Sequence, residues 1–228
     1  MKRTTNKMIA SILCLTMLAS ITSFAQEETV VTNENINPYV QEITEEVEIG
    51  GTAYSYEYDI QDGKKVTNIT NEDTSETDVL VYDEKTGVFF LNGNIVAEVE
   101  EVKSEDMNTE EQSGTDLFED NGANMQAKAS GYKYIGAINK KVTWKHGVAV
   151  AAVAAVIAAV LVDMTGAMVI AKMGYNAVKT FAKDCLGGRV RSKIYEMKAG
   201  KVTNYKHIWS FTTNKGTKYG NYTSYVSV

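Results

Sequence analysis

Few residues in this sequence belong to the types that carry out catalysis, and their spacing forms no catalytic pattern. The 228 residues include two histidines, His146 and His207, and two cysteines, Cys14 and Cys185. No HExxH, GxSxG or paired-cysteine motif occurs, so neither a zinc hydrolase nor an activated serine or cysteine is indicated. Carboxylates are abundant, but none stands in a recognisable acid–base arrangement. The sequence therefore predicts that the protein is not an enzyme.

The carboxylates also lack the spacing of a metal site. A calcium-binding loop needs oxygen ligands at regular intervals, and no Asp-x-Asp-x-Asp-Gly pattern is present. Cys185 stands alone, which favours a packing role over that of a nucleophile. We therefore predict no catalytic residue, no metal site and no cofactor.

The chemistry that the sequence does indicate is proteolytic processing of the chain itself. A basic start at residues 1–7 precedes an apolar stretch at 8–23, and Ser23 and Ala25 occupy the −3 and −1 positions of a cleavage site. This pattern predicts a signal peptide at residues 1–25, cleaved between Ala25 and Gln26, and hence secretion. An uncleaved anchor helix is the alternative.

A second possible processing site lies near the middle of the chain. Ala127 and Ala129 precede Ser130 in a polar stretch, and small residues in such a stretch suit proteolysis. Cleavage there would release a basic fragment, residues 130–228. The alternative is an ordinary flexible linker.

The charge of the chain is divided between two regions that meet near this site. The net charge is −6, but residues 26–125 hold 4 basic and 26 acidic groups, whereas residues 126–228 hold 16 basic and 3 acidic groups. This asymmetry indicates two separate tasks. The acidic region either supplies counter-charge to the basic region or is simply a solvated surface.

The elements that position these groups are predicted to form an α+β fold. An N-terminal antiparallel β meander is indicated by alternating apolar residues at 52–60, 65–70, 78–82, 88–91 and 95–102, with Asn92-Gly93 as a hairpin turn. A long Ala/Val-rich helix or helical hairpin follows, and then C-terminal antiparallel strands. The predicted segments are a signal peptide (1–25), an acidic leader (26–37), an acidic β domain (38–103), an acidic linker (104–130), an apolar and amphipathic helical region (131–188) and a basic aromatic β tail (189–228).

The helical prediction rests on the stretch from Gly147 to Ala171, in which only Asp163 and Thr165 are polar. As one helix it would be about 37 Å long, against about 30 Å for a bilayer core. A helix that is apolar on every side is a core element or a membrane element. Asp163–Gly166 would be the break if the stretch formed a hairpin. The residues predicted to contact a membrane are Val148, Val153, Val156, Ile157, Val160, Leu161, Val169 and Ile170.

The region after this stretch has a basic face. Lys172, Lys179 and Lys183, together with Asn176, recur at helical spacing. Such a helix suits the surface of an anionic membrane. The alternative is a surface helix packed on the core of the protein itself.

The C-terminal tail mixes Lys and Arg with Tyr and Trp. This mixture suits a lipid headgroup interface, and aromatic platforms also support carbohydrate binding. Single-stranded nucleic acid is a poorer candidate because export is predicted, so we expect no nucleic-acid partner. A plain antiparallel sheet rich in tyrosine is the simplest alternative.

The organisation resembles that of large secreted bacteriocin precursors of Gram-positive bacteria, of the closticin-like and geobacillin-like kind. The resemblance is carried by residues 127–130 as a processing point, Gly147–Ala171 as a membrane-active helix, and the Lys/Tyr-rich tail. It implies that the basic part permeabilises anionic bacterial membranes, that the acidic part is a pro-region or mask, and that an immunity protein is a possible partner.

Two functions are therefore predicted. The first is a secreted membrane-active antimicrobial that forms pores. The alternative is a non-lytic secreted or cell-surface interaction protein, in which the Ala/Val helix is a buried core element.

Overall fold

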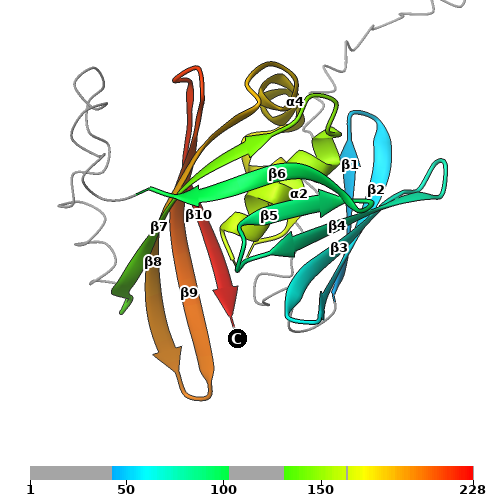
Figure 1. Cartoon of the computed structure of the whole chain (residues 1–228). Coiled ribbons are helices and arrows are strands. Elements are labelled where there is room, and N and C mark those ends of the chain that lie inside the picture. The colour runs from blue at the N-terminus through cyan, green and yellow to red at the C-terminus, as the bar shows by residue number, and fades with distance from the viewer. Residues whose placement is uncertain (1–42, 103–130, 163, 228) are drawn as a thin grey trace, which may run out of the picture. The chain divides into compact units, whose positions relative to one another are not determined.

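The computed structural model describes residues 43–102, 131–162 and 164–227. Within these residues ten strands form one antiparallel sheet, in which each strand pairs with the next one along the chain (Figure 1). The strands are β1 (Thr44–Ile49), β2 (Thr52–Gln61), β3 (Lys64–Asn71), β4 (Glu76–Asp83), β5 (Val88–Leu91), β6 (Asn94–Glu101), β7 (Lys133–Trp144), β8 (Gly187–Ala199), β9 (Val202–Thr213) and β10 (Lys218–Ser227).

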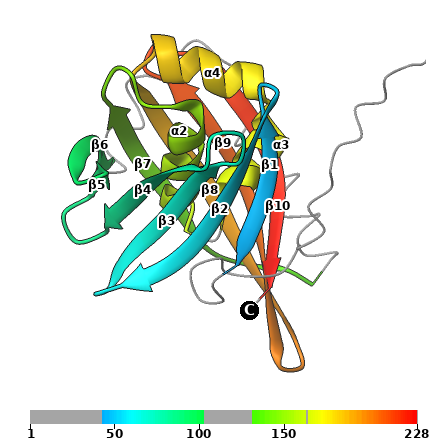
Figure 2. The ribbon, with the colours of Figure 1, turned by 90° about the vertical axis from the view of Figure 1, so that its right-hand side faces the viewer.

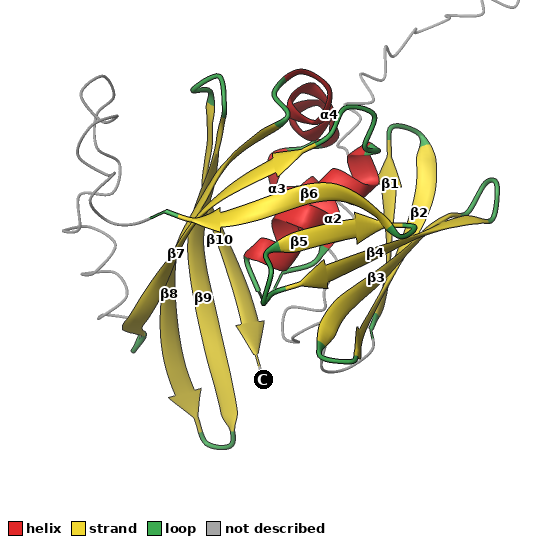
Figure 3. Ribbon diagram, viewed as in Figure 1, coloured by secondary structure: helices red, strands yellow, loops and turns green. Residues whose placement is uncertain are grey.

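Three short helices connect β7 to β8 and lie on the inner face of the curved sheet (Figure 3). They are α2 (Val150–Val160), α3 (Gly166–Met173) and α4 (Tyr175–Asp184). The first and last strands, β1 and β10, are not neighbours in the sheet, but both contact α3. Figure 2 shows α3 between these two strands. Helices α2 and α3 thus lie within the curve of the sheet, and α4 packs against them at one end.

The prediction of a long Ala/Val helix or a helical hairpin is wrong. The apolar stretch contains the 11 residues of α2 and most of the separate 8-residue helix α3, which ends at Met173, just beyond the stretch. Val162 has a left-handed backbone (φ +75°), which ends the first helix, and the Oγ1 of Thr165 accepts the N–H of Met168 at 3.1 Å, which caps the second. Gly174 (φ +80°) then separates α3 from α4. Antiparallel strands, not helices, make up most of the fold.

The predicted N-terminal meander agrees in part with the structure. Strands β2 to β6 occupy the positions where the sequence alternates, and Asn92 and Gly93 turn between β5 and β6 with positive φ values of 51° and 79°. Strand β1 was not predicted. Strand β7 was not predicted either, and it lies in residues that were assigned to the helical region 131–188.

The acidic and basic regions of the chain share one sheet. Residues Ala97–Glu101 of β6 pair with Lys140–Trp144 of β7 in antiparallel register. The N–H of Val102 donates to the carbonyl of Asn139 at 3.0 Å and continues the pairing. The charge boundary of the sequence is therefore not a boundary of the sheet.

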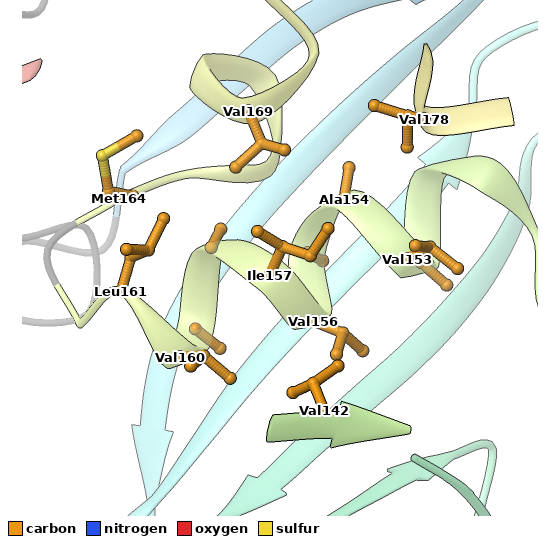
Figure 4. Packing of buried hydrophobic residues seen from close by; sticks show 14 of the residues in the cluster. Val142, Val153, Ala154, Val156, Ile157, Val160, Leu161, Met164, Val169 and Val178 are labelled. Carbon is orange, nitrogen blue, oxygen red and sulfur yellow. The ribbon is translucent and has the colours of Figure 1, made fainter. Parts of the chain in front are cut away.

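The core lies between the sheet and α2. Every residue of α2 from Ala151 to Val160 is at most 2% exposed. Figure 4 shows the side chains of Val153, Val156 and Ile157 among residues from β7, α3 and α4. An aromatic cluster completes one end of the core. The rings of Trp144 and Phe211 are stacked with their centres 6.0 Å apart, and the rings of Phe181 and Phe211 are tilted against each other at 4.8 Å.

Candidate functional site

Two tyrosines of the acidic region form hydrogen bonds with the starts of α2 and α3. The hydroxyl of Tyr56 donates to the carbonyl of Ala151 in the first turn of α2 at 3.1 Å, and the hydroxyl of Tyr58 accepts the N–H of Gly166 at the start of α3 at 2.8 Å. Both hydroxyls come from β2, and both rings are at most 1% exposed. The acidic region therefore contacts the helices through buried, directional bonds as well as apolar packing.

The start of α3 fits closely against the same strand. A Cβ placed on Gly166 would lie 2.7 Å from Cε1 of Tyr56, a distance that real side chains do not reach. Only glycine lets the helix end approach the tyrosine ring so closely.

A buried carboxyl group lies beside these tyrosines. Glu45 of β1 is 4% exposed, and its register partner is Tyr56. Burial raises the pKa of Glu45 above its ordinary value, and a hydrogen bond with the side chain of Thr165 partly offsets that rise. Burial also raises the pKa of Tyr56, with a further contribution from nearby Glu45. Glu45, Tyr56 and Thr165 thus connect β1, β2 and the start of α3.

The residues predicted to contact a membrane lie in the core. Val153, Val156, Ile157, Val160 and Leu161 are at most 1% exposed. Val169 and Ile170 are also buried, and Val148 is partly buried against the same core. Among the described residues, no helix is both long enough and apolar enough to cross a bilayer.

The predicted basic helical face is divided between two helices. Lys172 is in the last turn of α3, whereas Lys179 and Lys183 are in α4, after the break at Gly174. All three lysines are exposed, and the ammonium of Lys179 lies 5.2 Å from the centre of the Tyr175 ring. The opposite side of α4 buries Val178 and Phe181. The lysines therefore lie on the solvent side of a helix packed on the core.

The structure does not bring the histidines and the cysteine together. His146 is exposed, whereas His207 is fully buried on β9 with its Nδ1 3.4 Å from the Oγ of Ser192. Cys185 is the C-cap residue of α4. No group of three or more His, Cys, Asp or Glu side chains suited to a metal ion occurs in the part of the chain that the structure describes.

The outer face of the sheet is acidic over β1 to β6. Paired residues share a face, so the buried pairs Tyr56–Ile69 and Thr67–Leu80 identify the inner face. The sequence neighbours of these residues lie on the outer face. Lys64 on this outer face forms an ion pair with Asp83 at 3.3 Å. The outward acidic residues include Glu46, Glu48, Glu57, Asp59, Glu98 and Glu100.

The outer face of the same sheet is basic over β7 to β10. Here the inner rows include Val190 with Phe211 and Ser192 with Trp209. The described outward positions of these four strands contain no Asp or Glu. We call this surface the basic face; its cations are Lys141, Arg189, Arg191, Lys193, Lys206 and Lys218. Lys141 and Lys218 are exposed, whereas Arg189, Arg191 and Lys193 are partly buried and Lys206 is only 7% exposed.

A row of tyrosines crosses one end of the basic face. Tyr134 of β7 pairs with Tyr195 of β8, Tyr195 with Lys206 of β9, and Lys206 with Tyr225 of β10. Tyr134 and Tyr225 are 49% and 43% exposed, whereas Tyr195 and Lys206 between them are only 1% and 7% exposed. The ring of Tyr132, which precedes β7, lies 6.2 Å from that of Tyr225. We call these residues the tyrosine row.

Sequence reasoning found the composition of this surface but not its geometry. The Lys, Arg and Tyr residues of the tail were recognised, but Tyr134 and Lys141 were assigned to a helical region. The available signal was the alternation of Ile138, Val142 and Trp144 with polar residues, which is typical of a strand. The predicted cleavage positions Ala25–Gln26 and Ala127–Ser130, the leader and the linker lie outside the described residues.

Comparison with known proteins adds no family to these observations: no protein-family model, no curated protein and no solved structure matches the chain.

Proposed function

We propose that the protein is a secreted or cell-surface interaction protein that does not lyse membranes, and that its Ala/Val helix is a structural core element. The observation that supports this proposal is the burial of α2 on every side. The helix packs against β3 and β4 of the acidic region, β7 of the basic region, and α3 and α4. A helix that is apolar all round needs such an enclosure in water.

Burial of its apolar side chains strongly favours the position of α2 in the core. Full burial of one Val, Leu or Ile side chain is worth about 1.5–3 kcal/mol. Val153, Val156, Ile157, Val160 and Leu161 are all fully buried, and no polar side of the helix would remain in water after partial release. Exposing α2 would therefore require much of the domain to unfold.

The test uses the chain from residue 26 and vesicles loaded with a self-quenching dye. We expect no leakage from vesicles of phosphatidylcholine or of phosphatidylcholine with phosphatidylglycerol, because the apolar residues stay in the core. Detergent defines complete release. A variant with Ile157→Asp, which places a charge in the core, is the control for an opened fold. Leakage by the wild-type chain at concentrations where it remains folded would contradict the proposal.

A second candidate function is a latent membrane-active antimicrobial. The observation that favours it is that the acidic region helps to enclose the apolar helices. Strands β3 and β4 and the Tyr56 bond contact α2, and the Tyr58 bond contacts α3. Loss of β1 to β6 would uncover one side of the apolar helix. In this proposal the acidic region acts as a mask until the chain is cut and the two parts separate.

A protease site inserted between residues 127 and 130 distinguishes the two functions. The nicked chain keeps every described contact, so the non-lytic proposal expects it to remain one complex and to cause no leakage. The antimicrobial proposal expects the nicked chain to dissociate on anionic vesicles and release dye. Size-exclusion chromatography with and without vesicles reports dissociation, and an uncut chain with the same insertion is the control.

A further inference from the structure

We propose that Glu45 is a pH-dependent switch on β1: in its protonated form it holds the N-terminal half of the strand against α3, and its ionisation releases that half. The switch is independent of the proposed function, because it acts on a contact within the chain and requires no partner. What it regulates is the attachment of the acidic region to the start of α3.

The strand that carries Glu45 lies at an edge of the sheet. On one side β1 pairs with β2, and within the described residues its other side pairs with no strand. Glu45, Val47 and Ile49 lie on the inner face of β1, which contacts α3. A carboxyl group therefore occupies one of the few positions that hold this edge strand on the core.

The surroundings of Glu45 suit a neutral carboxyl group better than a charged one. Its side chain forms a hydrogen bond with that of Thr165, but among the described residues no group forms a hydrogen bond with its buried Oε2. A buried carboxylate with an unsatisfied oxygen is costly, and protonation removes most of that cost. Burial accordingly raises the pKa of Glu45.

The described groups that face Glu45 include no cation that could balance its charge. The nearest titratable groups are the buried phenols of Tyr56 and Tyr58 on β2. Helix α2 contains no ionisable residue, and the one in α3 is Lys172, which is exposed in the last turn. Asp163 lies outside the described residues. Ionisation of Glu45 is therefore relieved by solvation, and solvation requires the strand to move.

The turn between β1 and β2 holds the other end of the strand in place. Ile49 is 5% exposed, and a Cβ on Gly50 would lie 2.6 Å from Cζ of Tyr175 at the start of α4. Release therefore begins at the N-terminal end and involves Thr44–Val47, whose register partners are Tyr54–Glu57 of β2. An edge without a partner strand is a site for strand addition, so release would expose such a site on the acidic region.

The closed and open forms differ in the pKa of Glu45, and this difference makes opening depend on pH. In the open form the carboxyl group is solvated and has its ordinary pKa, whereas burial raises the pKa in the closed form. Opening is least favourable below the ordinary pKa. It should increase about tenfold for each pH unit between the two pKa values and level off above the higher one.

Hydrogen exchange of the chain from residue 26, measured by mass spectrometry at a series of pH values, tests the proposal. Glu45→Gln cannot ionise, and its matched control Glu46→Gln removes the same charge from an exposed position on the same strand. Because the intrinsic rate of exchange itself rises with pH, the chains are compared at the same pH. Relative to Glu45→Gln, the wild-type chain and Glu46→Gln should lose protection of Thr44–Val47 as pH rises, while the amides of α2 and β8 stay protected in all three.

Three results would overturn the proposal. One is the same protection of Thr44–Val47 in the wild-type chain and in Glu45→Gln at every pH. Another is a loss of the pH dependence in Glu46→Gln as well, which would assign the effect to the charge of the strand and not to the buried carboxyl group. The third is a parallel loss of protection in β1, α2 and β8, which would show unfolding of the whole domain. If Glu45→Gln does not fold, the ratio of exchange in β1 to exchange in α2 of the wild-type chain supplies a second measure, and a ratio that does not change with pH would contradict the switch.

Discussion

At the scale of single residues, two buried tyrosine hydroxyls join the acidic region to the helices. They differ in whether the backbone group that they contact has another hydrogen-bond partner. The carbonyl of Ala151 lies within α2, where the backbone N–H four residues later can also donate to it. The hydroxyl of Tyr56 is therefore an additional donor to this carbonyl. The N–H of Gly166 is in the first turn of α3 and has no intrahelical acceptor. The hydroxyl of Tyr58 therefore satisfies a group that would otherwise be buried without a partner.

This difference predicts that two conservative substitutions have unequal effects. Tyr58→Phe should lower the free energy of unfolding by about 1–3 kcal/mol, because it leaves a buried donor unsatisfied. Tyr56→Phe should cost about 0.5–1.5 kcal/mol, the net value of an ordinary hydrogen bond. Urea denaturation of the two variants measures both values. Equal losses, or a larger loss for Tyr56→Phe, would show that the start of α3 finds another acceptor.

Glu45 gives stability a defined dependence on pH. Burial raises the pKa of Glu45 above its ordinary value of 4.5 in the folded state. At a pH between the unfolded-state pKa and the folded-state pKa, the folded chain therefore binds more protons than the unfolded chain. This contribution to stability is complete below the unfolded-state pKa and is lost as pH rises through the folded-state pKa. Glu45→Gln should abolish that loss. Thermal denaturation of both chains across this range is the measurement, and parallel pH profiles would exclude Glu45 as the cause.

At the scale of elements, the sequence predicts strands better than it predicts the helical region. Alternation over residues 52–60 and the Asn92-Gly93 turn are local signals, and β2 and the β5–β6 hairpin follow them. The apolar stretch has no such local signal. A helix apolar on all sides is equally compatible with lipid and with a core, and only the curvature of a ten-stranded sheet around it decides between them.

The candidate site could also be predicted only in part from the sequence, because its arrangement depends on how the strands pair. The lysines and tyrosines of the tail identified a basic aromatic surface. Their division between an inner and an outer face depends on the register of β7, which shifts at a bulge between Tyr134 and Gly136. Because a shift of one residue exchanges the two faces of a strand, the basic face could not be assembled without the pairing partners.

The close fit of α3 to β2 predicts a large effect from a small substitution. Gly166→Ala adds a Cβ that would lie 2.7 Å from Cε1 of Tyr56, so the helix end or the ring must move. We expect a loss of about 1–3 kcal/mol, typical of overpacking in a core. Gly147→Ala provides a comparison, since no atom lies within 4 Å of its added Cβ, although its positive φ of 84° also disfavours alanine. A smaller loss at Gly166 than at Gly147 would contradict this account of the α3–β2 fit.

At the scale of the whole molecule, the charge difference between the regions becomes a difference between two parts of one surface. The sequence suggested two tasks in two units, whereas β6 and β7 pair directly and both regions enclose α2. A fold of this kind predicts mutual dependence. Separate expression of residues 26–102 and 131–228 should give chains without cooperative unfolding, and mixing them should restore it. Independent cooperative transitions of the two fragments would contradict a shared core.

The central claim, that α2 is a core element rather than a membrane element, is tested most directly by hydrogen exchange. The amides of Val150–Val160 should exchange as slowly as those of the central strands β3 and β8, both in buffer and when the chain from residue 26 is mixed with anionic vesicles. Rapid exchange of α2 in buffer, or a loss of strand protection on vesicles while α2 remains protected, would contradict the claim.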